Sequence, residues 1–184
     1  MFRIIIIFII LNIYNPASSA VKEMIISQMK ITSNLSFNFT QTIDNKSEKG
    51  KCIIKYPKKI YCKYDGVNKK IIVSNGKSLV IKINNQNNYN FYSLNRTPLE
   101  YLLDKDYLIS KIKSLEPREI DKKYLNFKIL ERNNELNIFF DKENFNLIGW
   151  QIEDIFQNLS ITFIHSVKIN QNVDENIFTL PKNN

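Results

Sequence analysis

Residues 49–64, KGKCIIKYPKKIYCKY, decide the fold of this chain. Two β-rich runs flank Pro57, and because proline cannot donate a hydrogen bond to a central ladder, it belongs at the turn between them. After the turn, Ile60, Cys62 and Tyr64 occupy every second position, which is the period of a half-buried strand. One face of this hairpin is apolar and the other is basic. The apolar face must therefore cover either a packed core or a ligand.

The N-terminus has the pattern of a secretory signal peptide. Residues 1–3 supply a short positive start, residues 4–13 are almost continuously apolar, and small residues lead up to Ala20. The apolar run is too short to cross the roughly 30 Å of a bilayer core comfortably, which disfavours a transmembrane anchor. No cysteine near Ala20 offers a site for a lipid. We predict a signal peptide over residues 1–20, cleaved after Ala20, followed by one domain over residues 21–184.

The chain is basic, with 26 Lys and Arg against 18 Asp and Glu, a net charge of +8. Removing Arg3 with the signal peptide leaves 25 basic residues and a net charge of +7. The lysines alternate with apolar residues along predicted strands and form no long run, so a solvated outer face accounts for them. No nucleic-acid partner is predicted.

Both cysteines of the chain, Cys52 and Cys62, lie in the hairpin, one on each side of Pro57. Folding about the turn could bring their Cα atoms within the roughly 4.4–6.8 Å that a disulfide needs, and export makes a bridge possible. A shift of one residue in strand register would instead place them on opposite faces. The sequence leaves both alternatives open: a disulfide, or two reduced thiols in the core.

The rest of the chain predicts a mainly β fold. Alternating apolar residues and turn signals such as Asn75-Gly76 predict further strands at residues 35–43, 69–74, 78–83, 89–94, 115–120, 124–130, 136–141, 147–154 and 159–170. In the first of these, only Gln41 breaks the apolar alternation. With the hairpin, the count is about eleven strands with short connections, which predicts an incomplete antiparallel β-barrel.

Three helical segments are also predicted. Residues 21–32 form an amphipathic pattern, and residues 107–112 form another. Between them lies the pattern of a capping box: Thr97 at the N-cap, Pro98 at the first helical position and Glu100 at the third. This pattern predicts a helix that runs to about residue 104. A helix that interrupts a β-meander is expected to lie across the open side of the sheet as a lid.

Few side chains of the chain are of the kinds that catalysis requires. His165 is the only histidine, and a lone histidine within a strand is more often structural than catalytic. Two cysteines and one histidine do not form a zinc set, and four glycines leave little scope for a phosphate-binding loop. Four carboxylates could be imagined as a site, although solvation at turns and strand ends explains them: Asp104, Asp106, Glu153 and Asp154. The sequence predicts no enzyme, no cofactor and no bound metal.

The order of several short motifs resembles the periplasmic outer-membrane lipoprotein carrier family, LolA. These motifs are SFNFTQ at residues 36–41, Gly50, the hairpin around Pro57, VSNGKSL at residues 73–79, Thr97-Pro98-Leu99, the strand with Trp150 and NIFTLP at residues 176–181. The resemblance covers residues 21–181. It implies an incomplete barrel whose helical lid closes an apolar cavity for lipoprotein acyl chains.

The resemblance also implies which residues form the site. The expected cavity residues are Phe39, Ile54, Ile60, Cys62, Tyr64 and Trp150, and the expected lid residues are Leu99, Leu102 and Leu103. The inward direction of Ile54 is contested by its neighbour Ile53. The family commonly has an arginine before the hairpin proline, where it latches the lid. Here that residue is Tyr56, so Tyr56 is a possible lid contact and the arginine latch is lost.

By the same resemblance, the expected partners are acylated lipoproteins as cargo, an inner-membrane lipoprotein-releasing transporter as donor and an outer-membrane lipoprotein receptor as acceptor. The protein would then be a monomeric periplasmic chaperone that carries lipoproteins between the two membranes. The alternative is a periplasmic sensor or interaction module of the same fold, which binds a partner protein or lipoprotein for signalling.

Overall fold

The computed structural model describes residues 16–67, 69–83, 89–132, 134–153 and 157–181. Several sequence predictions lie outside the described residues. These are most of the signal peptide (residues 1–15), the connection at residues 84–88 between the predicted strands 78–83 and 89–94, Asn133 between the predicted strands 124–130 and 136–141, and Asp154.

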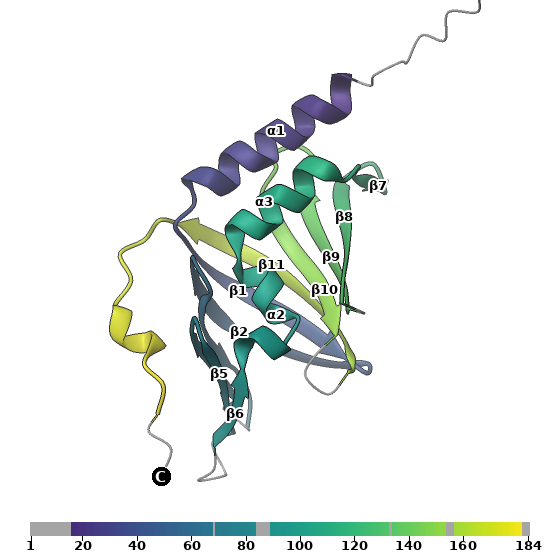
Figure 1. Ribbon diagram of the computed structural model, residues 1–184. Coiled ribbons are helices and arrows are strands. Elements are labelled where there is room, and N and C mark those ends of the chain that lie inside the picture. The colour runs from purple at the N-terminus through teal and green to yellow at the C-terminus, as the bar shows by residue number, and fades with distance from the viewer. Residues whose placement is uncertain (1–15, 68, 84–88, 133, 154–156, 182–184) are drawn as a thin grey trace, which may run out of the picture.

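One antiparallel sheet of eleven strands forms the body of the protein (Figure 1). The strands are β1 (Asn34–Ile43), β2 (Lys46–Lys55), β3 (Lys59–Tyr64), β4 (Ile71–Asn75), β5 (Ser78–Lys82), β6 (Tyr89–Ser93), β7 (Arg118–Ile120), β8 (Tyr124–Glu131), β9 (Asn134–Asp141), β10 (Leu147–Glu153) and β11 (Leu159–Ile169). Their order in space is β6-β5-β4-β3-β2-β1-β11-β10-β9-β8-β7. The two edge strands, β6 and β7, do not pair with each other, so the sheet curves without closing. The predicted incomplete barrel is confirmed.

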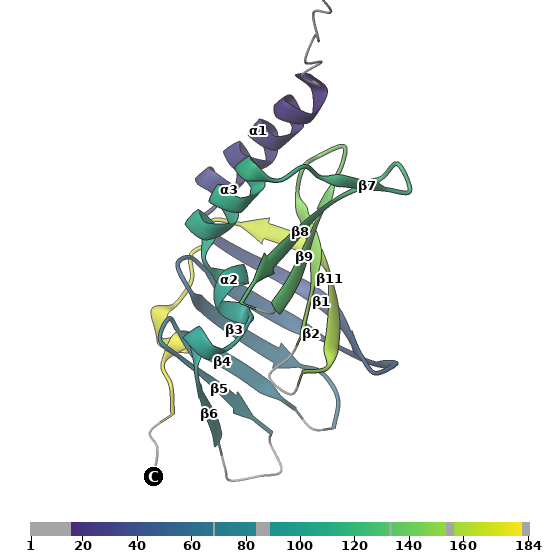
Figure 2. The ribbon, with the colours of Figure 1, turned by 45° about the vertical axis from the view of Figure 1, so that its right-hand side comes forward.

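Helices lie on the concave side and at one end of this sheet (Figures 1 and 2). They are α1 (Pro16–Ile31), the 3₁₀ turn η1 (Leu94–Arg96), α2 (Leu99–Leu103) and α3 (Lys105–Ser114). In both views α1 and α3 run side by side, and contacts join them. The shorter α2 lies over the concave face between the two halves of the sheet. Helix α1 begins before the predicted start of the first helix, inside the predicted signal peptide.

Two local sequence predictions are wrong. Thr97 does not cap a helix, because its hydroxyl donates to the carbonyl of Leu94 (2.8 Å) and closes η1. The Glu100 carboxylate is bound by Lys58 instead of returning to the Thr97 backbone, so no capping box forms. The strand predicted at residues 115–120 begins only at Arg118, because the Leu115 N–H still donates to Lys111 at the end of α3 (3.0 Å).

The two cysteines are joined by a disulfide. In the β2–β3 hairpin, Cys52 lies directly opposite Cys62, with their Cα atoms 4.1 Å apart. The hairpin turns through Pro57, as predicted, and the register places Ile54 opposite Ile60 on the same inner face. Of the two alternatives that the sequence left open, the structure has the bridge.

The C-terminal segment covers apolar residues on the outer face of the sheet. Val73 and Val80 are cross-strand neighbours that point away from the concave face, yet they are only 6% and 1% exposed. The 3₁₀ turn η2 (Glu175–Phe178) contacts β3 and β4, and Phe178 is 2% exposed. A second, smaller apolar layer therefore exists outside the sheet. The helices cover the large concave face on the other side of the sheet.

Candidate functional site

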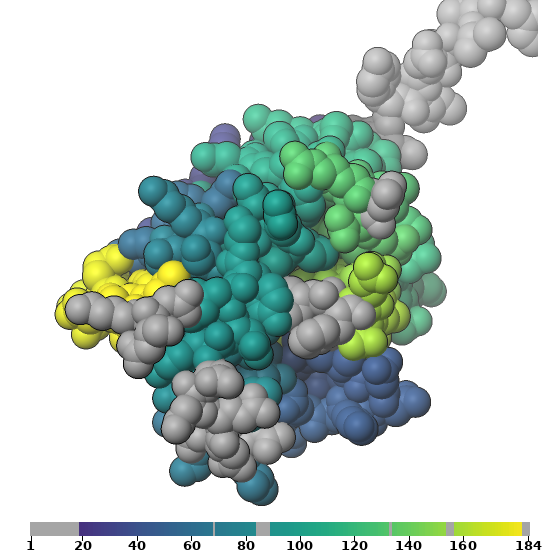
Figure 3. Space-filling model, turned by 60° about the horizontal axis from the view of Figure 1, so that its bottom comes forward, coloured from purple at the N-terminus to yellow at the C-terminus, as the bar shows by residue number. Residues whose placement is uncertain are grey.

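An apolar cavity of about 330 Å³ lies between the concave face of the sheet and the segment that leads into α2. This volume falls within the range of small-molecule binding sites, which is roughly 300–1,000 Å³. Apolar side chains from six strands form most of the wall: Phe39, Ile60, Ile72, Leu79, Tyr92, Trp150 and Ile152. The lining continues to Ile83, Asn90 and Glu153. In the space-filling view from below, the teal segment that contains β6 and α2 lies near the middle of the face (Figure 3).

Most of the expected cavity residues do border this space. Phe39, Ile60, Cys62, Tyr64 and Trp150 all line it, and Cys52 adds the other half of the disulfide. Ile54 faces inward, as expected, but it is fully buried among other core residues and does not border the cavity. The alternation along the hairpin predicts which face is inward. It does not predict where along that face the packing ends and the void begins.

The expected lid residues also fall into two groups, one that lines the cavity and one that lies in the core. Leu99 lines the cavity, together with Thr97 and Pro98 before it. Leu102 and Leu103 are 1% and 0% exposed and lie in the hydrophobic core, away from the cavity wall. The start of α2 is therefore the part that covers the void, and its last turn is the part that anchors it.

Lys58, in the hairpin turn, holds α2 in place. Its backbone N–H donates to the carbonyl of Leu103 (2.9 Å). Its ammonium group lies 3.0 Å from the Glu100 carboxylate and 3.3 Å from that of Asp104. The hydrogen bonds to Glu100 and then Asp104 raise the pKa of Lys58 above its ordinary value. Because that pKa is raised by folding, the ion pairs are complete at neutral pH and are lost only as the pH rises through it.

A Lys58→Met variant should loosen α2 while leaving the protein folded. Partly exposed ion pairs contribute at most about 1 kcal/mol, so we expect amide exchange of residues 99–104 to accelerate measurably, by up to roughly fivefold. Hydrogen exchange with mass spectrometry measures this. Lys59→Met is the matched control, since the next lysine pairs with Glu175 near the C-terminus (2.9 Å). Equal acceleration in both variants, or none in either, would contradict the assignment of Lys58.

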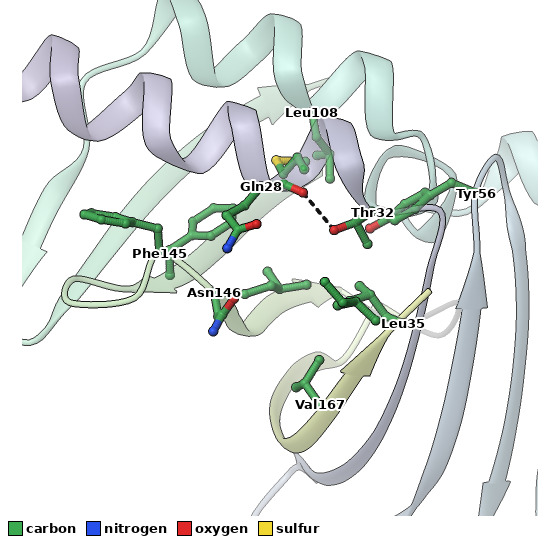
Figure 4. A pocket seen from close by; sticks show the side chains of 12 residues that line it. Gln28, Thr32, Leu35, Tyr56, Leu108, Phe145, Asn146 and Val167 are labelled. Atoms are coloured by element: carbon green, nitrogen blue, oxygen red, sulfur yellow. Dashed lines mark hydrogen bonds between the residues drawn. The ribbon is translucent and has the colours of Figure 1, made fainter. Parts of the chain in front are cut away.

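Tyr56 takes a different place from the one that the resemblance implied. Its ring borders a smaller cavity, of about 50 Å³, between α1 and the sheet (Figure 4). The Tyr56 N–H donates to Ser33 (3.0 Å), and the ammonium of Lys105 lies 5.7 Å from the ring centroid. Burial raises the pKa of Tyr56, so it is a neutral phenol. Tyr56 thus lies near the start of α3 and the end of α1, and Lys58 makes the contacts with α2.

A polar cluster interrupts the apolar wall, and sequence reasoning missed it. Gln41 points into the cavity, where its amide oxygen accepts from the Tyr64 hydroxyl (2.7 Å). Its amide nitrogen donates to Ser160 Oγ (2.9 Å) and Thr162 Oγ1 (3.3 Å). The ammonium of Lys70 lies 3.8 Å above the Tyr64 ring. The one available signal was Gln41 itself, a polar residue at an inward position of an otherwise alternating strand.

The described residues that were considered for catalysis come from separate parts of the fold. His165 lies exposed on β11, with its Nδ1 3.2 Å from Ser166 Oγ. Asp104 caps α3 by accepting from the Tyr107 N–H (3.1 Å), and Glu153 borders the cavity at the end of β10. Within the described residues, no three potential metal ligands converge. None of the described helices combines the length and the apolar character needed to span a membrane.

Solved structures share this architecture at low sequence identity. An uncharacterized conserved protein from Thermus thermophilus is 5% identical, with a TM-score of 0.52 over 90% of this chain and 95% of that one. A putative outer membrane lipoprotein-sorting protein domain from Vibrio parahaemolyticus is 6% identical, with a TM-score of 0.50 over 89% of this chain and 96% of that one. At these identities the likeness shows the fold alone.

The sequence itself matches a family model. No protein of curated function matches the chain. The model described as outer membrane lipoprotein carrier protein LolA matches residues 30–181, which include the eleven described strands and α2, the helix that borders the cavity. The chain therefore belongs to the LolA family.

Proposed function

We propose that this protein binds the acyl chains of lipoproteins in the 330 Å³ cavity and carries lipoproteins from the inner to the outer membrane. The observation that supports the proposal most strongly is an apolar void, walled by Phe39, Ile60, Leu79 and Trp150, in a member of this family. A protein with no ligand to bind would be expected to fill such a space with side chains, because interiors pack to the density of organic crystals.

The energetics explain why such a carrier would be needed. Each buried methylene contributes about 0.8 kcal/mol, so a lipoprotein with several acyl chains is held in a bilayer by tens of kcal/mol. It cannot cross an aqueous compartment unaided. A cavity that offers a comparable apolar area makes the exchange between membrane and carrier nearly neutral, and no chemical reaction is required of the carrier.

Helix α2 is suited to act as the movable cover of this cavity. It has only five residues, and its first residue, Leu99, touches the void. Leu102 and Leu103 anchor its last turn, and the ion pairs that hold it among the described residues are with Lys58, partly exposed and weak individually. Opening α2 would cost some of the binding energy of the cargo and so keep the affinity moderate enough for release.

The remaining parts of the proposal concern location and partners. The protein is exported, loses residues 1–20 after Ala20, and works as a monomer in the periplasm. Its cargo is acylated lipoproteins, which an inner-membrane lipoprotein-releasing transporter delivers and an outer-membrane lipoprotein receptor accepts. The lipoprotein-sorting description of the Vibrio parahaemolyticus structure agrees with this role, and that description applies to that protein.

Native mass spectrometry of the protein exported by a Gram-negative host tests the proposal. We expect a mature chain that starts at Val21, carries no lipid of its own and co-purifies in part with acylated protein. The same host expressing unacylated cargo, with its lipidated cysteine replaced, is the control and should give the free chain alone. Co-purification that does not depend on acylation would favour the sensor or interaction module.

A further inference from the structure

The polar cluster of Gln41, Tyr64, Ser160 and Thr162 lies in a wall that is mostly apolar. Gln41 and Thr162 are directly opposite each other on β1 and β11, and Ser160 lies two residues before Thr162 on β11. Their nearest partners on β10 are apolar, with Trp150 opposite Thr162 and Ile152 opposite Ser160. Ser160 and Thr162 are only 2% and 3% exposed. Buried polar groups of this kind require hydrogen-bond partners.

The hydrogen bonds within the cluster have a definite direction. Tyr64 is a neutral phenol, since burial raises its pKa and the carboxylate of Glu48 raises it further. Its proton goes to the amide oxygen of Gln41 (2.7 Å), which turns the amide nitrogen of Gln41 toward β11. The two N–H groups of that nitrogen then serve the two hydroxyl oxygens, at 2.9 and 3.3 Å.

Both hydroxyls therefore act as acceptors toward Gln41 and keep their own protons for another partner. A serine or threonine hydroxyl carries one donor and two acceptor positions, and only an acceptor position of each is occupied here. Among the described residues, no hydrogen bond uses either proton. Ser160 and Thr162 both line the cavity, so an acceptor atom on a bound molecule could take these protons.

We propose that Ser160 and Thr162 form a recognition site for the carbonyl oxygen of an acyl ester or acyl amide, a conclusion that rests on the proposed function. An acyl chain attached to glycerol or to an amino group ends in such an oxygen. With its chain against Trp150 and Ile152, the carbonyl would lie beside the hydroxyl pair. A carboxylate is disfavoured, because Lys70, the one cationic side chain among the described lining residues, is already paired with Glu48.

Competition binding with matched ligands tests this site. Methyl laurate and a hydrocarbon with the same number of heavy atoms each displace a fluorescent apolar probe, and the ratio of their affinities is measured for each protein variant. We expect wild type to prefer the ester, and Ser160→Ala and Thr162→Val each to reduce that preference by roughly fivefold, the effect of one neutral hydrogen bond. Affinity for the hydrocarbon should stay the same or rise.

The control variant is Thr42→Val. Thr42 follows Gln41 on β1, but its hydroxyl pairs with Ser47 (2.9 Å) outside the cavity, so the same deletion should leave the ratio unchanged. Because the ratio is taken within one protein, a loss of stability in a variant does not alter it. Denaturant midpoints confirm that each variant is folded.

Each outcome decides between the two proposals. Equal affinities for ester and hydrocarbon in wild type, or an unchanged ratio in both cavity variants, would overturn the carbonyl site and leave the carrier function standing. Preference for laurate over its methyl ester would overturn it in favour of an anion site. Binding of neither ligand would overturn both proposals. A further comparison, of a diacylated peptide with a phospholipid of the same chains, shows which source of esters is preferred.

Discussion

Replacing Ile54 by alanine should lower the free energy of unfolding by about 2–5 kcal/mol, whereas the same change at Ile60 should cost clearly less. The two residues face each other across the β2–β3 hairpin and point to the same side of the sheet. Ile54 is 0% exposed and packed on all sides, so its truncation leaves a new void in a solid core. Ile60 already borders the cavity, and part of its surface has no protein atoms to lose.

Ligand binding should follow the opposite order. Ile60→Ala removes apolar wall and should weaken the binding of an acylated peptide, while Ile54→Ala should leave it nearly unchanged in the folded fraction. Denaturant titrations give the stabilities, and probe displacement gives the affinities. Equal losses of stability at the two positions, without any effect on binding, would indicate that the interior behaves as one solid core.

Leu99→Asp should have the largest effect on cargo. Leu99 is half-buried at the start of α2 and lines the cavity, so the aspartate can turn toward solvent in the empty protein at a modest cost in stability. With an acyl chain bound, α2 must close over apolar surface with a charge beneath it. We expect a loss of affinity of at least tenfold, measured by titration with an acylated peptide.

Leu102→Asp is the informative comparison for that variant. Leu102 is 1% exposed and sits in the core, so a charge there should destabilise the whole protein rather than weaken binding alone. If Leu99→Asp also unfolded the protein, or bound cargo like wild type, the start of α2 could not be the cover of the cavity.

The strands of this protein could be predicted from sequence because the period of two is local. The alternation after Pro57 gives the inner face of β3, and the turn position aligns Cys52 with Cys62 once the register is known. The apolar layer on the outer face of the sheet could not be predicted from the sequence. The C-terminal turn η2 contacts β4 from about a hundred residues away in sequence, and no pattern within β4 indicates which of its two faces meets that turn.

The site could be predicted only in part, for a related physical reason. A void is the absence of packing, and composition does not indicate whether apolar residues such as Ile54 and Ile60 fill a space or line one. The attachment of α2 was also not predictable. Lys58 directly follows the hairpin proline, and its contacts with Glu100 and Asp104 join residues more than forty positions apart.

The central claim is that acyl chains enter the cavity, and Trp150 provides a direct measurement of it. Trp150 is the only tryptophan of the chain, and it lines the cavity wall. A peptide whose acyl chains carry bromine atoms, which quench tryptophan fluorescence on contact, should quench Trp150 in a saturable way, and the unbrominated peptide should compete. Binding of the acylated peptide without quenching of Trp150, or no saturable binding at all, would contradict the claim.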